Sequence, residues 1–238
     1  MKLSLCITTI DRWNFLKVSL PKYLENPYIV EIVICDENGK DKAIIDSVYA
    51  NNQKIRTFKN DCILGAFLNK RRVVSLANNE FVCLMDSDNF APVSYFETWE
   101  KYLNGAQPDI NTIYSPSKTT KQANHPGFDH SELNGLIINK SNLKYCWKNY
   151  RCTQGACNIG NYIISKTLMA KGEPYDIAMA VNSKSLDVLY QNYLLFTLGD
   201  CNLILIPNME YDHIVHDGSY YIQTSHMVNI PLYNSLYE

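Results

Sequence analysis

The sequence predicts an α/β fold in which a mainly parallel central sheet is flanked by helices. In the first half, apolar segments of strand length alternate with helical patterns, the order that such a sheet requires. The strand segments are rich in β-branched and aromatic residues and end in polar or turn-forming residues. They comprise residues 3–9, 30–35, 54–58, 81–85, 111–115 and 202–207.

Two of the intervening segments have the periodicity of amphipathic helices. Residues 14–24 and 64–77 carry apolar side chains at a spacing of three to four, which places them on one helix face. In open α/β sheets, ligands bind beyond the carboxyl ends of the strands. Asp36 and Asp86 both fall at such ends.

The second half contains a long polar segment and one more predicted helix. Residues 116–160 show no clean periodicity, and we interpret them as a functional loop region, because strand 202–207 must pair with the first half's sheet. Residues 185–199 have one apolar helical face, with Ser185 as a candidate N-cap. We therefore expect a single domain over residues 1–238.

Composition excludes several classes of function. A net charge of -2 gives no basic excess for a nucleic acid or an anionic membrane. The eight cysteines are scattered without a CxxC pair, which predicts mostly buried thiols in a reducing compartment. The N-terminal apolar segment is too short for a signal peptide, and no apolar run approaches ~20 residues. We expect a cytoplasmic protein without a transmembrane segment or a nucleic-acid partner.

The segment FVCLMDSDNF, residues 81–90, places two aspartates directly after a buried strand. Carboxylates at the edge of a core are costly unless water, donors or a cation meet them. Two carboxylates two residues apart suit a divalent cation, which prefers hard oxygen ligands. The alternative is that Asp86 and Asp88 cap the turn around Asn89 and Pro92.

Three motifs in the first 90 residues together resemble glycosyltransferase family 2, which has the GT-A fold and a D-x-D metal motif. CITTIDRWNFLKVSL resembles the family's first strand and its T-x-N-R-x-x-x-L-x-x-x-L pattern, and EIVICDENG resembles the second strand with its D-D-G-S ending. LGAFLNKRRVVSLANNEFVCLMDSD then reaches the D-x-D without a gap. Departures include DENG for DDGS, Lys70 for arginine and Arg71 for asparagine.

The resemblance implies a Rossmann-like nucleotide-sugar-binding half, 1–115, and an acceptor-binding half, 116–238. Asp88 would bind Mn²⁺ or Mg²⁺ directly, while Asp86 would face the ribose or reach the metal through water. Ser87, which lies between them, would line the nucleotide site, and Lys70 would contact the diphosphate. Runs such as Lys70 to Arg72 are otherwise usually solvated surface.

Three residues at the first two strand ends would complete the nucleotide pocket. By the resemblance, Asp36 would accept a hydrogen bond from the base or the ribose, and a turn-forming role in DENG is the alternative. Thr8 and Thr9 would line the same pocket, mostly through backbone groups. Ordinary strand-end threonines are the competing interpretation.

Two histidines follow the last predicted strand. In the family pattern, a histidine about six residues after the strand-end proline completes the metal or diphosphate site, and His213 lies six after Pro207. Imidazole is a common metal ligand. We therefore assign His213 to the metal site with His216 as the alternate, and a carboxylate or phosphate partner stays open for either.

The general base is expected near the start of the predicted helix 185–199. Asp187 matches the aspartate of the family's E-D pair, although Leu186 replaces the glutamate. Asp187 in a first turn could instead interact with the helix dipole, for roughly 0.5 kcal/mol. Asp176 is the nearest rival, because a general base is defined by its reach to the proton.

The resemblance implies a metal-dependent, hexosyltransferase-like enzyme that moves a sugar from a nucleoside-diphosphate donor to an acceptor hydroxyl, with inversion. A UDP-sugar is favoured over a GDP-sugar, and the acceptor would be a glycan, a lipid-linked molecule or a protein. One alternative is a sugar nucleotidyltransferase, which would need a glycine-rich loop after the first strand, but ITTIDRW has no glycine. The other is a non-catalytic nucleotide-sugar or glycan-binding module.

Overall fold

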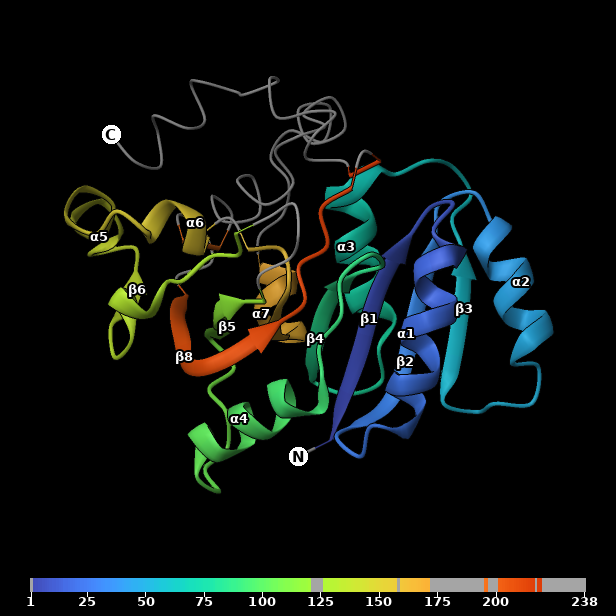
Figure 1. The fold of residues 1–238 in the computed structure, drawn as a ribbon, viewed down its shortest axis with the longest axis horizontal. Coiled ribbons are helices and arrows are strands. Elements are labelled where there is room, and N and C mark those ends of the chain that lie inside the picture. Colours follow the sequence, from blue (N-terminus) through green and yellow to red (C-terminus); the bar gives the residue numbers. More distant parts are fainter. Residues whose placement is uncertain are drawn as a thin grey trace.

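The computed structural model describes residues 2–120, 126–157, 159–171, 195–196, 201–216 and 218–219. Within them, eight strands form one sheet in the order β3-β2-β1-β4-β7-β5-β8-β6 (Figure 1). The strands are β1 (Leu3–Thr9), β2 (Ile29–Asp36), β3 (Ile55–Lys59), β4 (Phe81–Asp86), β5 (Thr112–Thr119), β6 (Ile137–Asn139), β7 (Tyr162–Ser165) and β8 (Asn202–Tyr211).

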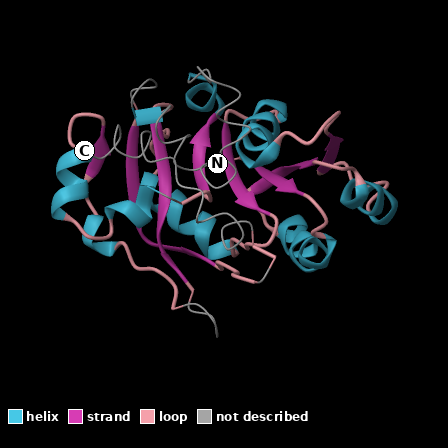
Figure 2. Cartoon of the chain, turned by 90° about the horizontal axis from the view of Figure 1, so that it is seen from above, coloured by secondary structure: helices cyan, strands magenta, loops and turns pink. Residues whose placement is uncertain are grey.

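Helices lie on both faces of this sheet, as the view from above shows (Figure 2). They are α1 (Trp13–Glu25), α2 (Lys40–Val48), α3 (Gly65–Leu76), α4 (Val93–Leu103), α5 (Leu143–Asn149), α6 (Thr153–Cys157), α7 (Lys166–Lys171) and the 3₁₀ helix η1 (Ser131–Leu133). No helix in the described part of the chain is long and apolar enough to cross a membrane.

The predicted α/β class is confirmed, with a mixed sheet that is largely parallel. Strands β3, β2, β1 and β4 pair in parallel, as do β5 and β8. Strand β7 runs antiparallel between β4 and β5, and β6 runs antiparallel to β8. The sequence did not predict β6 or β7, because segments of three and four residues are too short for a periodic signal.

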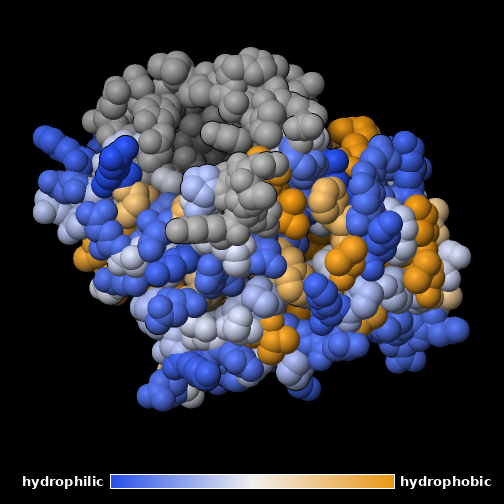
Figure 3. All heavy atoms as spheres, viewed as in Figure 1, coloured by the Kyte–Doolittle hydropathy of each residue, from blue (hydrophilic) through white to orange (hydrophobic). Residues whose placement is uncertain are grey.

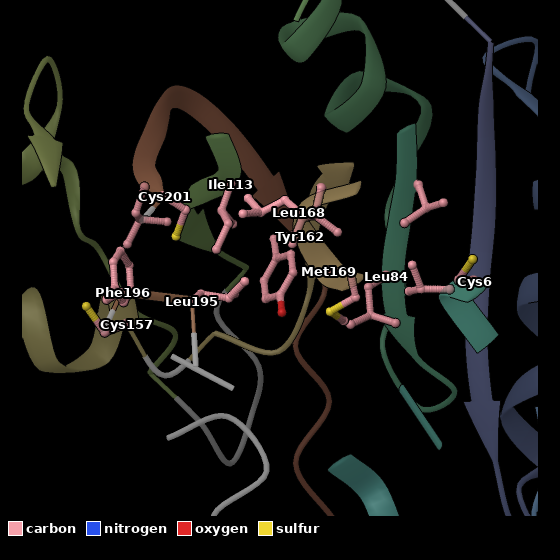
Figure 4. Packing of buried hydrophobic residues seen from close by; sticks show 14 of the residues in the cluster. Cys6, Leu84, Ile113, Cys157, Tyr162, Leu168, Met169, Leu195, Phe196 and Cys201 are labelled. Carbon is pink, nitrogen blue, oxygen red and sulfur yellow. The ribbon is translucent and has the colours of Figure 1, made fainter. Parts of the chain in front are cut away.

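The sheet separates two hydrophobic clusters, because successive side chains of a strand point to opposite faces. Leu3, Leu5 and Ile7 of β1 belong to the cluster that includes residues of α1 and α4. Cys6 belongs to the opposite cluster, which includes residues of α3 and α7. Figure 4 shows that second cluster, where Leu84 lies beside Cys6. The scattered cysteines are thiols without disulfides, and most are buried, as predicted.

The outer surface is mainly polar. On the face shown in Figure 3, hydrophobic side chains lie in several small groups among hydrophilic ones. Exposed apolar residues occur on separate elements, for example Val18 on α1 and Val48 on α2. Surface apolar residues in small groups are normal for folded domains and do not indicate a membrane-binding face.

The segment predicted as a loop region, 116–160, is more structured than expected. Strand β5 continues to Thr119, and η1, β6, α5 and α6 follow. None of these later elements exceeds seven residues, so their sequence patterns span less than two helical turns. The predicted helix 185–199 lies outside the described residues except for Leu195 and Phe196, which are buried.

Asp41 of α2 caps the start of the neighbouring helix α1. Its carboxylate accepts hydrogen bonds from Arg12 N at 2.8 Å, Trp13 N at 2.9 Å and Thr9 Oγ1 at 2.5 Å. Helix α1 has no side-chain cap of its own, and Asp41 is only 2% exposed. The end of β1 and the start of α1 are therefore held in place by a residue of α2.

We expect Asp41→Ala to lower the free energy of unfolding by about 3 kcal/mol, because one buried and two partly buried donors lose their acceptor. Urea unfolding measures this loss. Asp46→Ala on the same helix is the matched control, since Asp46 forms a partly exposed pair with Lys42, and such pairs contribute about 1 kcal/mol or less. Equal losses in the two variants would contradict the capping role of Asp41.

Candidate active site

The carboxyl ends of β1, β4 and β8 lie at one edge of the sheet. The turn after β4 pairs with the segment after β8 through the bridge between Phe90 and Asp212. Ile214 N also donates to Asn89 Oδ1 at 2.9 Å. Asn89 and Ile214 are 125 residues apart in the sequence. Two distant segments therefore form one local structure here.

Asp86 lies at the end of β4, and each oxygen of its carboxylate contacts another side chain. Lys70 Nζ lies 3.1 Å from Asp86 Oδ1, and Asn161 Nδ2 donates to Asp86 Oδ2 at 3.2 Å. The Lys70 side chain is 5% exposed and that of Asp86 is 32% exposed. Lys70 thus points into the site, whereas the charged residues of such a run usually lie on the solvated surface.

Asp88 is the more buried carboxylate, with 17% of its side chain exposed. Burial, together with the negative charge of Asp86, raises the pKa of Asp88 above its ordinary value. A hydrogen bond from His216 Nε2 to Asp88 Oδ2 at 3.1 Å and the positive charge of Arg12 oppose this rise. The negative charge at this turn is therefore not fully compensated by the side chains around it.

The carboxylates of Asp86 and Asp88 are suitable ligands for a hard divalent cation. The raised pKa of Asp88 means that an added positive charge would favour its ionised form. Among the described residues, no three His, Cys, Asp or Glu side chains come together as a metal-binding group. Asp88 is the better candidate ligand, since Lys70 and Asn161 already contact both oxygens of Asp86.

The two candidate histidines have different neighbours. Strand β8 runs to Tyr211, four residues beyond the predicted end, so His213 follows the strand closely. The hydroxyl of Tyr211 lies 3.2 Å from His213 Nδ1. His216 is the histidine that contacts Asp88. The structure therefore brings His216, the alternate candidate, to the D-x-D turn.

The other predicted nucleotide residues have mainly structural contacts. Asp36 is fully buried and accepts hydrogen bonds from the backbone N–H groups of Asn38 at 3.1 Å and Lys42 at 2.8 Å. This is the turn-forming role that DENG also allowed, and the predicted contact of Asp36 with base or ribose stays a prediction. Thr9 uses its hydroxyl to bond Asp41. Thr8 lies in register with Asp86.

Ser87 is 8% exposed, in the middle of the D-x-D turn. Its predicted role at the nucleotide stays a prediction. Asp187 and Asp176, the candidate bases, lie outside the described residues.

Sequence reasoning missed the contribution of Arg12, Asn161 and Tyr211 to the site. Arg12 stands in the first motif, and its guanidinium donates to Gly218 O beside the D-x-D turn. Its place in that motif was a signal that could have found it. Asn161 and Tyr211 carry no such signal, because their role depends on how β7 and β8 pair in space.

Residues 4–161 match the family model described as glycosyl transferase family 2. The chain belongs to this family. The match covers all three sequence motifs and ends at Asn161, the residue that contacts Asp86. A comparison with curated proteins gave no match.

Solved structures show the same GT-A architecture as this family 2 chain. TarS 1–349 of S. aureus has a TM-score of 0.63 at 15% identity, over 89% of this chain and 60% of that one. The same fragment in complex with UDP-GlcNAc gives 0.62 at 15% identity, over 92% and 60%. The mannosyltransferase PcManGT from Pyrobaculum calidifontis, in complex with GDP-Man and Mn²⁺, gives 0.58 at 11% identity, over 93% and 59%. The chain thus spans about three fifths of these structures, and the likeness is one of fold.

Proposed function

We propose that this protein is a metal-dependent glycosyltransferase that moves a sugar from a nucleoside-diphosphate donor to an acceptor hydroxyl. The observation that carries the proposal is the Asp86 and Asp88 turn, which lies at the carboxyl edge of the sheet within the family-matched segment. Ligands of open α/β sheets bind at that edge. The structural neighbours with UDP-GlcNAc and GDP-Man support a nucleotide-sugar donor, with UDP favoured and GDP the alternative.

Asp88, with Asp86 beside it, would hold Mn²⁺ or Mg²⁺. When bound, such an ion supplies positive charge to the diphosphate that leaves with the nucleotide. His216 holds one oxygen of Asp88 through a hydrogen bond, and Lys70 holds one oxygen of Asp86. Both contacts orient the carboxylates before any ligand arrives, which lowers the cost of ordering them on binding.

The protein's own cations would bind the donor's phosphates. Lys70 points into the site next to Asp86, and Arg12 lies close enough to Asp88 to affect its pKa. Both come from segments that the family resemblance assigns to nucleotide binding. An anionic diphosphate between these groups would balance their charge, as paired charges do in partly buried sites.

The acceptor half, 116–238, would supply the base. Asp187 would take the proton from the acceptor hydroxyl in one in-line displacement that inverts the anomeric carbon. Asp176 is its rival. The acceptor would be a glycan, a lipid-linked molecule or a protein. We place the enzyme in the cytoplasm, a reducing compartment that suits its free cysteines.

Melting temperatures measured with UDP, GDP, dTDP and CMP, each with and without Mn²⁺, test the proposal. A ligand that binds only the folded state stabilises it by about 2.7 kcal/mol at one hundred times its Kd. We expect one nucleoside diphosphate to raise the melting temperature, and more so with Mn²⁺. No shift with any nucleotide would contradict the proposal. A shift without donor hydrolysis would indicate the non-catalytic binding module instead.

A further inference from the structure

A polar cavity lies at the edge of the sheet opposite to the D-x-D turn. Asn202, the first residue of β8, lines this cavity and pairs with Thr112 of β5 on one side and with Asn139 of β6 on the other. Strands β4 and β5 run in the same direction, because β7 is antiparallel to both. Strand β5 has eight residues, so at about 3.3 Å per residue the two edges are roughly 25 Å apart. The cavity is therefore separate from the site at Asp86 and Asp88.

The size and the lining of the cavity favour a polar, anionic ligand. Its volume is about 740 Å³, within the range of about 300 to 1,000 Å³ that small-molecule sites occupy. The described residues that line it are all polar, namely three asparagines, two lysines, a serine and an aspartate. Sites for apolar ligands are lined mainly by hydrophobic side chains. The charged members are Lys140, Lys171 and Asp109, so positive charge is in excess.

Hydrogen bonds within the lining fix the orientation of its asparagine amides. The backbone N–H of Ser141 can only donate, so the atom of Asn139 that lies 3.0 Å from it is the amide oxygen. The amide nitrogen of Asn139 then donates to Asn202 Oδ1 at 3.4 Å. The ammonium group of Lys171 can also only donate, and Asn111 Oδ1 accepts from it. Asn111 and Asn202 therefore both use their amide oxygens inside the lining.

The hydrogen-bonding groups that remain in the cavity are mainly donors. In the part of the chain that the structure describes, no acceptor meets the amide nitrogen of Asn111 or of Asn202. Lys171 has three N–H donors, one of which goes to Asn111. The Asp109 carboxylate already accepts from Asn111 N at 3.0 Å and from Thr112 Oγ1 at 2.7 Å, and these hydrogen bonds lower its pKa. A ligand with several acceptor oxygens matches this set.

We propose that this cavity binds a phosphate group, at a site that is distinct from that of the donor nucleotide. An ionised phosphate has three strong acceptor oxygens, and lysine binds it as a point charge. A carboxylate has only two oxygens and would meet fewer of the donors. The volume of the cavity leaves room for a polar molecule that carries the phosphate, such as a sugar. The inference does not depend on the proposed function, because its residues lie at the other edge of the sheet.

The side-chain amide signals in ¹H–¹⁵N spectra of the full chain report on this site directly. The signals of Asn111 and Asn202 are identified by their loss in Asn111→Asp and Asn202→Asp. Glucose 6-phosphate, inorganic phosphate, glucuronate and glucose are titrated into the wild type in EDTA. We expect both signals to shift, with saturation, on addition of either phosphate, and to stay in place with glucuronate and glucose. Tighter binding of glucose 6-phosphate would show that the carrier also contacts the cavity, and equal affinities would limit the contact to the phosphate, so that both results support the site.

Asn202→Asp tests the donor set with little change of shape. It keeps the oxygen that accepts from Asn139, and it replaces the unused N–H donors by an oxygen that shares a negative charge. We expect phosphate to bind about tenfold more weakly or worse, because a hydrogen bond to a charged group is lost and a like charge is added. The remaining signal of Asn111 measures this affinity. Lys171→Met, which keeps the length of the side chain and removes its charge, should also weaken phosphate binding.

Asn51→Asp and Lys17→Met are the matched controls. Both residues are exposed and lie on other parts of the fold, in the turn before β3 and on α1. We expect wild-type phosphate binding in both controls. The affinity for the preferred nucleoside diphosphate with Mn²⁺ should be unchanged in Asn202→Asp. If the wild type bound no nucleoside diphosphate, the proposed function would fail, whereas the titration with phosphate would still decide the inference.

Two results would overturn the phosphate site. One is the absence of any shift of the Asn111 and Asn202 signals with both phosphates, or shifts of equal size and affinity with glucuronate or glucose. The other is an equal loss of phosphate binding in Asn51→Asp and Asn202→Asp, because the effect would then follow from net charge and not from the cavity.

Discussion

Replacing Asp88 by asparagine is expected to abolish Mn²⁺-dependent nucleotide binding while raising the melting temperature of the ligand-free protein. Burial and the charge of Asp86 raise the pKa of Asp88, so the folded state binds this proton more tightly than the unfolded state. The stability linked to that proton is present at low pH and is lost as the pH rises through the raised pKa. At neutral pH the Asp88 charge therefore destabilises the fold, and asparagine removes that charge.

Asp86→Asn is the matched control, with the opposite effect on stability. It removes the anionic partner of Lys70, whose side chain is 5% exposed, and a buried charge that loses its partner is costly. Melting temperatures of both variants between pH 4 and about 8, with and without UDP, GDP and Mn²⁺, measure the difference. Retained Mn²⁺-dependent stabilisation in Asp88→Asn, or a lower melting temperature without ligand, would contradict the assignment of Asp88.

Asp187→Asn is expected to reduce sugar transfer by roughly 10²-fold or more, with nucleotide affinity and melting temperature near those of the wild type. A general base acts on the acceptor's proton in the transition state, so its removal affects turnover and leaves donor binding intact. Asparagine keeps the size of the side chain but cannot take up the proton. Steady-state rates and nucleotide titrations on the same preparation separate the two effects.

Asp176→Asn serves as the control for the base, and we expect a much smaller loss of transfer. A near-normal rate in Asp187→Asn would remove this residue from the mechanism. NMR of the product's anomeric centre gives a second test, since retained configuration would reject inversion whatever the variants show.

The first half of the fold was predictable because its elements are long and regular. Residues 3–9 were predicted as a strand with the bounds that β1 has, and 81–85 differs from β4 by one residue. Apolar residues follow one another along these strands without alternating with polar ones, because both faces of the sheet are covered. Strand β7 was not predicted, although it joins the two halves of the sheet, because its four residues resemble any short apolar segment.

The candidate site was only partly predictable for a related reason. Asp86, Asp88 and Lys70 lie in local motifs, and the structure places the three together at one strand end, with Lys70 paired to Asp86. Asp36 lies in a motif as well, but its carboxylate is used by the backbone of its own turn. Asn161 reaches Asp86 across 75 residues of sequence, and a contact of that kind depends on the pairing of β4 with β7.

The most direct test of sugar transfer is the release of nucleoside diphosphate from a set of UDP-sugars and GDP-sugars, measured with Mn²⁺ for the wild type and Asp88→Asn. Water can take the place of the acceptor hydroxyl, so we expect slow hydrolysis of a bound donor even when the acceptor is not supplied. We predict release from at least one donor by the wild type and none above background by Asp88→Asn. Equal release by the two proteins, or binding of a nucleotide sugar by the wild type without any release in the presence of candidate acceptors, would contradict the proposed enzyme.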